Sequence, residues 1–255
     1  MADMIVLLRQ VPDLVEELEL NDDSTDVERE FMKFVLSEWD DYALEEALLV
    51  KEASQGSVTV VALDDPDVDQ VLYTALAKGA DKAVKLTGSE EGWIDSHQRA
   101  RTIASWMRNQ TYDLVLTGVQ SVEDIDGQVG MLLAQELQHP HVSVVVSVET
   151  KNGSARVTQE FGGGRFSELD VQLPAVLGIQ QSRQAPRYAP ISRVRQAQQA
   201  GGLEEVPTEV SGGSGLTVRR LYAPESTDHA EMLEGSADEV ADKIIELLRS
   251  RGLIK

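Results

Sequence analysis

The sequence contains no cysteine among its 255 residues. This excludes a disulfide framework, a zinc site built on thiolates, a cysteine nucleophile and a cysteine-ligated iron–sulfur cluster. Basic residues are also scarce, with 23 Lys and Arg against 44 Asp and Glu, so the formal net charge is −21 at pH 7. That charge argues against a general nucleic-acid binder and against docking on anionic lipid, because both need a basic face.

Long apolar runs are missing as well. No apolar stretch approaches the roughly 18 residues that a membrane-spanning helix needs. The first eight residues lack the basic region and the cleavage site of a secretory signal. We therefore expect a cytoplasmic protein with no membrane insertion. The hydrophobic fraction of 42% still permits a core, and the length suits one large domain or one domain with an appendage.

The charge is unevenly distributed along the chain. Residues 1–50 hold 15 acidic residues and only three basic ones. No acidic residue lies between Asp170 and Glu204, where four arginines occur, at positions 183, 187, 193 and 195. This basic segment predicts either a specific docking surface or an ordinary solvated loop.

The first half of the chain alternates short apolar runs with amphipathic segments. The runs predict strands at 4–8, 58–63, 83–86 and 114–116, and the amphipathic segments predict helices at 39–54, 68–76, 100–107 and from Asp126 to Leu137. Such alternation predicts a mainly parallel sheet with helices on both faces.

The second half has a different pattern. Strands are predicted at 142–148, 155–161 and 171–179 with no helix between them, and Gly162–Gly164 is best explained as a hairpin turn. Residues 183–221 show no clear periodicity, and a capping box at Ser236–Glu239 then opens a last helix that Gly252 closes. We expect an α/β nucleotide-binding domain over 1–182, and a loop, arm and terminal helix over 183–255.

The segment from Gly118 to Gly130 is the strongest candidate for a binding site. It follows a predicted buried strand and leads into a helix, and open α/β sheets bind ligands at such places. Free N–H groups at Gly127, Gln128 and Val129 could hold a phosphate at the helix start. The alternative is a plain connecting loop that needs glycine only for its turn. We find no catalytic Ser–His–acid set, no phosphate-loop motif and no metal site in the sequence.

Five motifs then resemble one family, the β subunit of electron transfer flavoproteins, nearly from end to end. They begin at Arg9 (RQVPD), Trp39 (WDDYALEEA), Thr74 (TALAKGAD), Gly118 (GVQ, continued by GQVG at 127–130) and Pro186 (PRYA). The resemblance implies a Rossmann-like fold of the adenine nucleotide α-hydrolase type, with an added antiparallel hairpin region and an extended C-terminal arm that wraps an α subunit.

The resemblance also implies a function, a set of cofactors and a set of partners. Such a subunit is not an enzyme but carries electrons from flavin dehydrogenases to an acceptor such as a quinone oxidoreductase. It does so in a heterodimer whose FAD is held mainly by the α subunit. The β subunit itself holds a structural AMP or, in electron-bifurcating members, a second FAD.

By position in the family, two groups of residues are expected to act. The nucleotide contacts are expected at Leu7, Ser37, Leu63, Gly118, Val119, Gln120, Asp126, Gly127, Gln128, Val129 and Gly130. The docking residues for partner dehydrogenases are expected at Arg187, Tyr188, Ile191, Arg193 and Arg195, with Ile191 as the apolar anchor.

Two hypotheses from other classes remain open at this point. An ATP-hydrolysing or adenylating enzyme on the same fold would need a basic residue or a metal-binding carboxylate pair over a polyphosphate, and the 118–130 loop has no base. A nucleotide-binding stress or signalling module would leave the Pro-Arg-Tyr-Ala motif unexplained.

Overall fold

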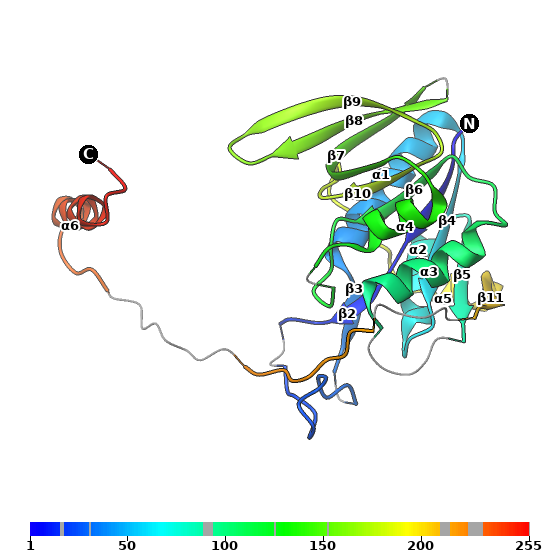
Figure 1. Cartoon of the computed structure of the whole chain (residues 1–255), viewed down its shortest axis with the longest axis horizontal. Helices are drawn as coiled ribbons and strands as arrows, with labels where there is room; N and C mark the ends of the chain where they lie inside the picture. Colours follow the sequence, from blue (N-terminus) through cyan, green and yellow to red (C-terminus); the bar gives the residue numbers. More distant parts are fainter. Residues whose placement is uncertain are drawn as a thin grey trace. The chain divides into compact units, whose positions relative to one another are not determined.

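The computed structural model describes residues 1–15, 18–30, 32–88, 94–124, 126–151, 153–209, 215–223 and 232–254. The chain divides into two compact units, Met1–Arg220 and Leu221–Lys255. The first unit is built on a sheet of nine strands in the order β11-β5-β4-β1-β6-β10-β7-β8-β9 (Figure 1). Neighbouring strands are parallel from β11 to β7. β8 is antiparallel to both of its neighbours, β7 and β9.

The parallel part of the sheet alternates with helices as the sequence predicts. Its elements are β1 (Asp3–Leu7), α1 (Glu38–Ser54), β4 (Ser57–Leu63), α2 (Val68–Lys78), β5 (Lys82–Thr87), α3 (Ser96–Met107), β6 (Leu114–Gly118) and α4 (Val129–Leu137). A separate antiparallel pair, β2 (Gln10–Pro12) and β3 (Phe34–Leu36), was not predicted. These strands are three residues long, too short for a periodic signal.

The core lies on both faces of the sheet. Successive side chains of β1 point to opposite faces, so Met4 and Val6 pack in a cluster with residues of α1 and α2. Ile5 and Leu7 pack in the other cluster, with residues of α3 and α4. This two-sided burial explains why β1 is a continuous apolar run rather than an alternating one.

The antiparallel region corrects one predicted strand. It consists of β7 (His141–Lys151), β8 (Ser154–Phe161) and β9 (Arg165–Gln172), and it is followed by β10 (Ala175–Ile179). The turn at Gly162–Gly164 joins β8 to β9 as expected. The single strand predicted at 171–179 is wrong, however, because β9 ends at Gln172 and β10 lies between β6 and β7. Pro174 stands between the two strands, and a proline has no N–H for a central sheet ladder.

A helix and a strand also occur where the sequence shows no periodicity. These are α5 (Ile191–Ala200) and β11 (Leu203–Pro207). α5 packs on α2, and β11 extends the sheet in parallel beside β5. Val194 is the one buried residue that the structure describes in α5, so a hydrophobic pattern could not reveal this helix.

The second unit contains α6 (Ala237–Ser250). Its capping box is present as predicted, since Ser236 Oγ accepts a hydrogen bond from Glu239 N and Glu239 Oε2 accepts one from Ser236 N. No described side chain of α6 is buried, and Ile244 and Leu247 are exposed. Among the described helices, none is long and apolar enough to cross a membrane.

Candidate functional site

The site lies at the carboxyl ends of three adjacent parallel strands. β1 is central, with β4 on one side and β6 on the other. The chain passes from β1 to β4 and β5 and then returns across β1 to form β6, so the direction of winding reverses between β1 and β6. Open α/β sheets bind ligands in the crevice at this kind of reversal.

A pocket occupies this position and is lined by residues in or next to β1, α1, β4, α3, β6 and α4. Apolar walls come from the ends of β1 and β4 and from α3, and polar groups come from four further side chains. The lining residues are Leu7, Leu8, Arg9, Asp40, Val61, Ala62, Leu63, Arg99, Ile103, Thr117 and Val129. Apolar walls with a few convergent polar groups are typical of small-molecule sites.

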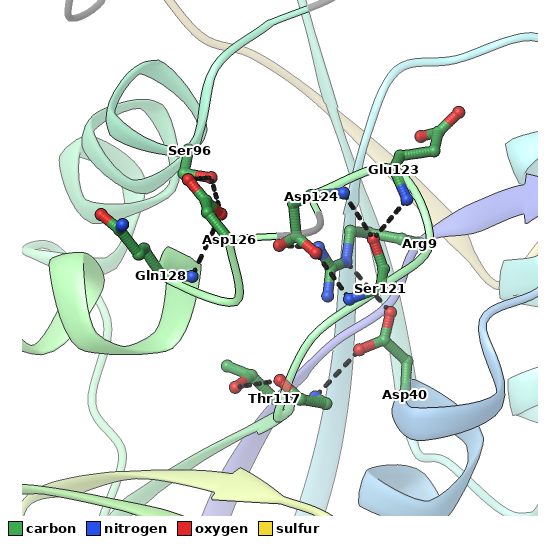
Figure 2. Close-up of polar contacts among 10 residues, drawn as sticks. Arg9, Asp40, Ser96, Thr117, Ser121, Glu123, Asp124, Asp126 and Gln128 are labelled. Atoms are coloured by element: carbon green, nitrogen blue, oxygen red, sulfur yellow. Dashed lines mark hydrogen bonds and ion pairs between the residues drawn. The ribbon is translucent and has the colours of Figure 1, made fainter. Parts of the chain in front are cut away.

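Arg9 is the centre of a buried ionic network at the floor of this site. Its Nε lies 3.2 Å from Asp40 Oδ2, and its Nη1 pairs with Asp124 (Figure 2). Asp40 also accepts a hydrogen bond of 2.9 Å from the N–H of Gly118. Burial alone would lower the pKa of Arg9, but the carboxylates of Asp40 and Asp124 raise it, so Arg9 stays charged. The network joins β1, α1 and the loop after β6.

The loop after β6 is held by its own acidic residues. Asp124 accepts a hydrogen bond from the N–H of Ser121 as well as pairing with Arg9. Asp126 accepts one from Ser96 Oγ at 2.9 Å, which ties the loop to the first turn of α3 (Figure 2). The acidic side chains therefore orient the loop, and those two carboxylates have protein partners.

The expected nucleotide contacts are spread over the pocket and the loop above it. Leu7, Leu63 and Val129 line the pocket. Gly118 follows the lining residue Thr117, and Ser37 lies just before α1, 1% exposed, with no hydrogen-bond partner for its Oγ. The others lie outside the lining, in the loop and at the start of α4: Val119, Gln120, Asp126, Gly127, Gln128 and Gly130.

The four polar residues that line the pocket were not among the expected contacts: Arg9, Asp40, Arg99 and Thr117. Arg9 and Asp40 stand inside the motifs that carry the resemblance, so their sequence context was a usable signal. Nothing in the sequence marked Arg99 as a pocket residue, because a basic residue on an amphipathic helix usually lies on the solvent-exposed face.

Gly118 offers a direct test of this packing. A Cβ atom at this position would lie 2.5 Å from Asp40 Oδ1 and 2.7 Å from Trp39 Cβ. We expect Gly118→Ala to lower the free energy of unfolding by about 3 kcal/mol, because the contact forces the network apart. Chemical denaturation measures this. Gly162→Ala is the control, since a Cβ there meets nothing within 4 Å; equal effects of the two changes would contradict the prediction.

The basic segment lies against α1. Arg183 Nε is 2.8 Å from Glu46 Oε1, and Glu46 also accepts a hydrogen bond of 2.7 Å from Val148 N. Arg187 pairs with Glu45, with Nη2 2.9 Å from Oε1, and with Glu52. Hydrogen bonds to Glu45 raise the pKa of Arg187 above its ordinary value. Two of the four arginines thus pair with Glu45 and Glu46 of the acidic N-terminal region of the same chain.

The remaining expected docking residues project from this anchored segment. Tyr188 is 80% exposed and Ile191, the first residue of α5, is 66% exposed. Arg193 and Arg195 are exposed on α5. The segment therefore presents apolar and basic groups to solvent, and Arg187 holds it to the body of the protein.

Comparison with known proteins relates the chain to one family. The electron transfer flavoprotein domain matches residues 27–209. The chain is 35% identical to an electron transfer flavoprotein subunit beta of Methylophilus methylotrophus, over 96% of this chain and 97% of that protein. It is 28% identical to the subunit beta of Thermoanaerobacterium thermosaccharolyticum, over 99% of this chain and all of the relative. It is also 28% identical to subunit CarD of a caffeyl-CoA reductase–Etf complex of Acetobacterium woodii, over 98% and 99%.

Proposed function

The chain belongs to the electron transfer flavoprotein family, and from its similarity to the β subunits we propose that it is the β subunit of an electron-carrying heterodimer. An α subunit would hold most of the FAD. The heterodimer would take electrons from flavin dehydrogenases and pass them to an acceptor such as a quinone oxidoreductase. The single observation that carries the proposal is the family match along nearly the whole chain. We expect the complex in the cytoplasm.

The pocket at the ends of β1, β4 and β6 suits a structural AMP. Leu7 and Leu63 offer apolar surface for a base. Ser37 Oγ is buried without a partner, and a buried hydroxyl of this kind is expected to find one in a ligand. The first N–H groups of α4 have no intrahelical acceptor and suit a phosphate. These features support nucleotide binding, with no acid or base needed for turnover.

The flavin supplies the electron transfer when it is bound, and this chain supplies binding and docking. Tyr188, Ile191 and the exposed arginines of α5 would meet the partner dehydrogenase. An apolar anchor surrounded by charge favours fast, transient encounters, because charge steers association and one buried side chain gives most of the affinity. The terminal unit with α6, whose apolar residues are exposed, would pack on the α subunit.

The test of the proposal is co-expression with the α subunit, followed by an absorption spectrum and analysis of released nucleotide. We expect one FAD and one AMP per heterodimer. Two FAD per heterodimer would contradict a structural AMP and favour the electron-bifurcating alternative. A colourless monomer that hydrolyses ATP would contradict the proposal and favour the enzyme hypothesis.

The docking role of Ile191 gives a separate prediction. Ile191→Ala should slow electron exchange with a partner dehydrogenase about tenfold, because the apolar anchor is lost. Stopped-flow flavin absorbance measures the rate. Gln198→Ala, an exposed position on the same helix, should leave it unchanged. Flavin must stay bound in both variants; loss of flavin from Ile191→Ala would contradict a docking role.

A further inference from the structure

We propose that Arg99 pairs with the phosphate of a nucleotide bound in the pocket and makes the pocket select phosphorylated adenosine over adenosine itself. This inference rests on the nucleotide-binding part of the proposed function. It adds to that site a side chain from α3, whereas the sequence singles out only the loop after β6 and the start of α4.

Arg99 lies where it can reach a ligand bound in the pocket. It lies in the first turn of α3 and lines the pocket together with Leu7 and Leu63. The 118–130 loop has no basic residue of its own. Two of the N–H groups that the sequence predicts for a phosphate are also in use, because Gly127 N donates to Asp124 O and Gln128 N to Asp126 Oδ1. Arg99 brings a full positive charge to the same pocket from a neighbouring helix.

Two nearby arginines differ from Arg99 because carboxylates of the protein pair with them. Arg9 pairs with Asp40 and Asp124, and Arg29 pairs with Asp26 and Glu123. Within the part of the chain that the structure describes, the Arg99 guanidinium has no hydrogen bond and no ion-pair partner. It is partly buried all the same. Of these three cations, Arg99 is the one that no described carboxylate pairs with, so its whole guanidinium fork is available to a ligand.

The electrostatics of the pocket point to an anion as that ligand. Burial lowers the pKa of Arg99 first, and the charge of Arg9 lowers it further. The more distant charges of Glu123, Asp124 and Asp65 act in the opposite direction, but they offset only part of this effect. A guanidinium held near another cation in a partly dry site is stabilised by a bound anion.

The geometry of the donors favours a phosphate. The planar fork of an arginine matches phosphate oxygens with two parallel hydrogen bonds. α4 begins at the pocket residue Val129, and the first N–H groups of a helix have no intrahelical acceptor. The apolar walls then remain for the base and the ribose.

The experiment is isothermal titration of the purified α/β complex, freed of any bound AMP, with AMP and with adenosine. We expect AMP to bind at least about 100-fold more tightly than adenosine. Arg99→Gln should weaken AMP binding about 10- to 100-fold and leave adenosine binding unchanged. Arg99→Lys should fall between the two, because it keeps the charge and loses the fork.

The same titration supplies the control and the results that would overturn the inference. Arg101→Gln changes a neighbouring arginine that pairs with Glu136, and it should keep the wild-type preference. Arg99→Gln with the wild-type preference, or with equal losses of AMP and adenosine affinity, overturns the inference. A complex that carries FAD but binds neither ligand overturns it as well, and leaves the electron-carrier proposal standing. Absence of flavin, with the Arg99 effect intact, would instead count against the proposed function.

Discussion

Replacing Asp40 by asparagine is expected to lower the free energy of unfolding by about 3 kcal/mol, because it removes one partner of a buried ion pair. Asp40 is 1% exposed and Arg9 is 9% exposed, so water cannot take over the lost interaction. Asp124 still pairs with Arg9, which limits the loss. An asparagine keeps the shape of Asp40 and can still accept the Gly118 N–H. Its NH2 group would then face Arg9 Nε in place of Oδ2, so the effect reports on the loss of the ion pair and its hydrogen bond.

Urea denaturation of the purified chain or complex measures this effect, with Glu38→Gln as the control. Glu38 precedes Asp40 by two residues in the same first helical turn and is exposed, so its loss should change stability by less than about 0.5 kcal/mol. The double variant Arg9→Gln/Asp40→Asn should be less destabilised than the sum of the single variants, since each already breaks the same pair. Additive losses would show that the two residues do not interact.

Replacing Glu45 by glutamine is expected to release the segment that carries Tyr188 and Ile191. Glu45 is 3% exposed, accepts a hydrogen bond of 2.9 Å from Arg187 N and pairs with the Arg187 guanidinium. Loss of these charged hydrogen bonds should cost about 2 kcal/mol, which is roughly a 30-fold increase in local opening. Trypsin cleavage after Arg187, followed by mass spectrometry, measures that opening.

Glu52→Gln is the matched control, because Glu52 pairs with the same guanidinium but is 59% exposed. Exposed ion pairs contribute about 0–1 kcal/mol, so cleavage after Arg187 should rise only slightly in this variant. If the segment docks a dehydrogenase, Glu45→Gln should also raise the KM for that partner more than it lowers kcat. Equal cleavage in the two variants would show that the buried carboxylate does not anchor the segment.

The alternation of strands and helices was readable from the sequence wherever an element buries a full face. β1 and β4 are apolar runs covered on both sides, and their predicted positions agree with the structure to within one residue at each end. α5 and β11 were missed for the opposite reason. α5 buries only Val194 among its described residues, and β11 has two partly buried apolar residues, so neither produces a periodic pattern.

The candidate site was likewise predictable from the sequence only in part. The loop from Gly118 to Gly130 was identified because glycines after a buried strand are a local signal. The basic segment was also visible, as a stretch of arginines without acids. Its pairing with Glu45 and Glu46 was not, since these residues are more than 130 positions away in the chain. Two of the four arginines of the basic segment, Arg183 and Arg187, pair with carboxylates of the same chain.

By itself, therefore, the sequence determined the fold class, the family and the place of the loop, because these depend on local patterns and motifs. The tertiary structure alone decided which charges meet. It places Arg9 between Asp40 and Asp124 and holds Arg187 on α1. It also places Arg99 beside the pocket with no ion pair to a carboxylate that the structure describes. The physical reason is that an ion pair depends on a few ångströms in space, and distance along the chain does not encode that separation.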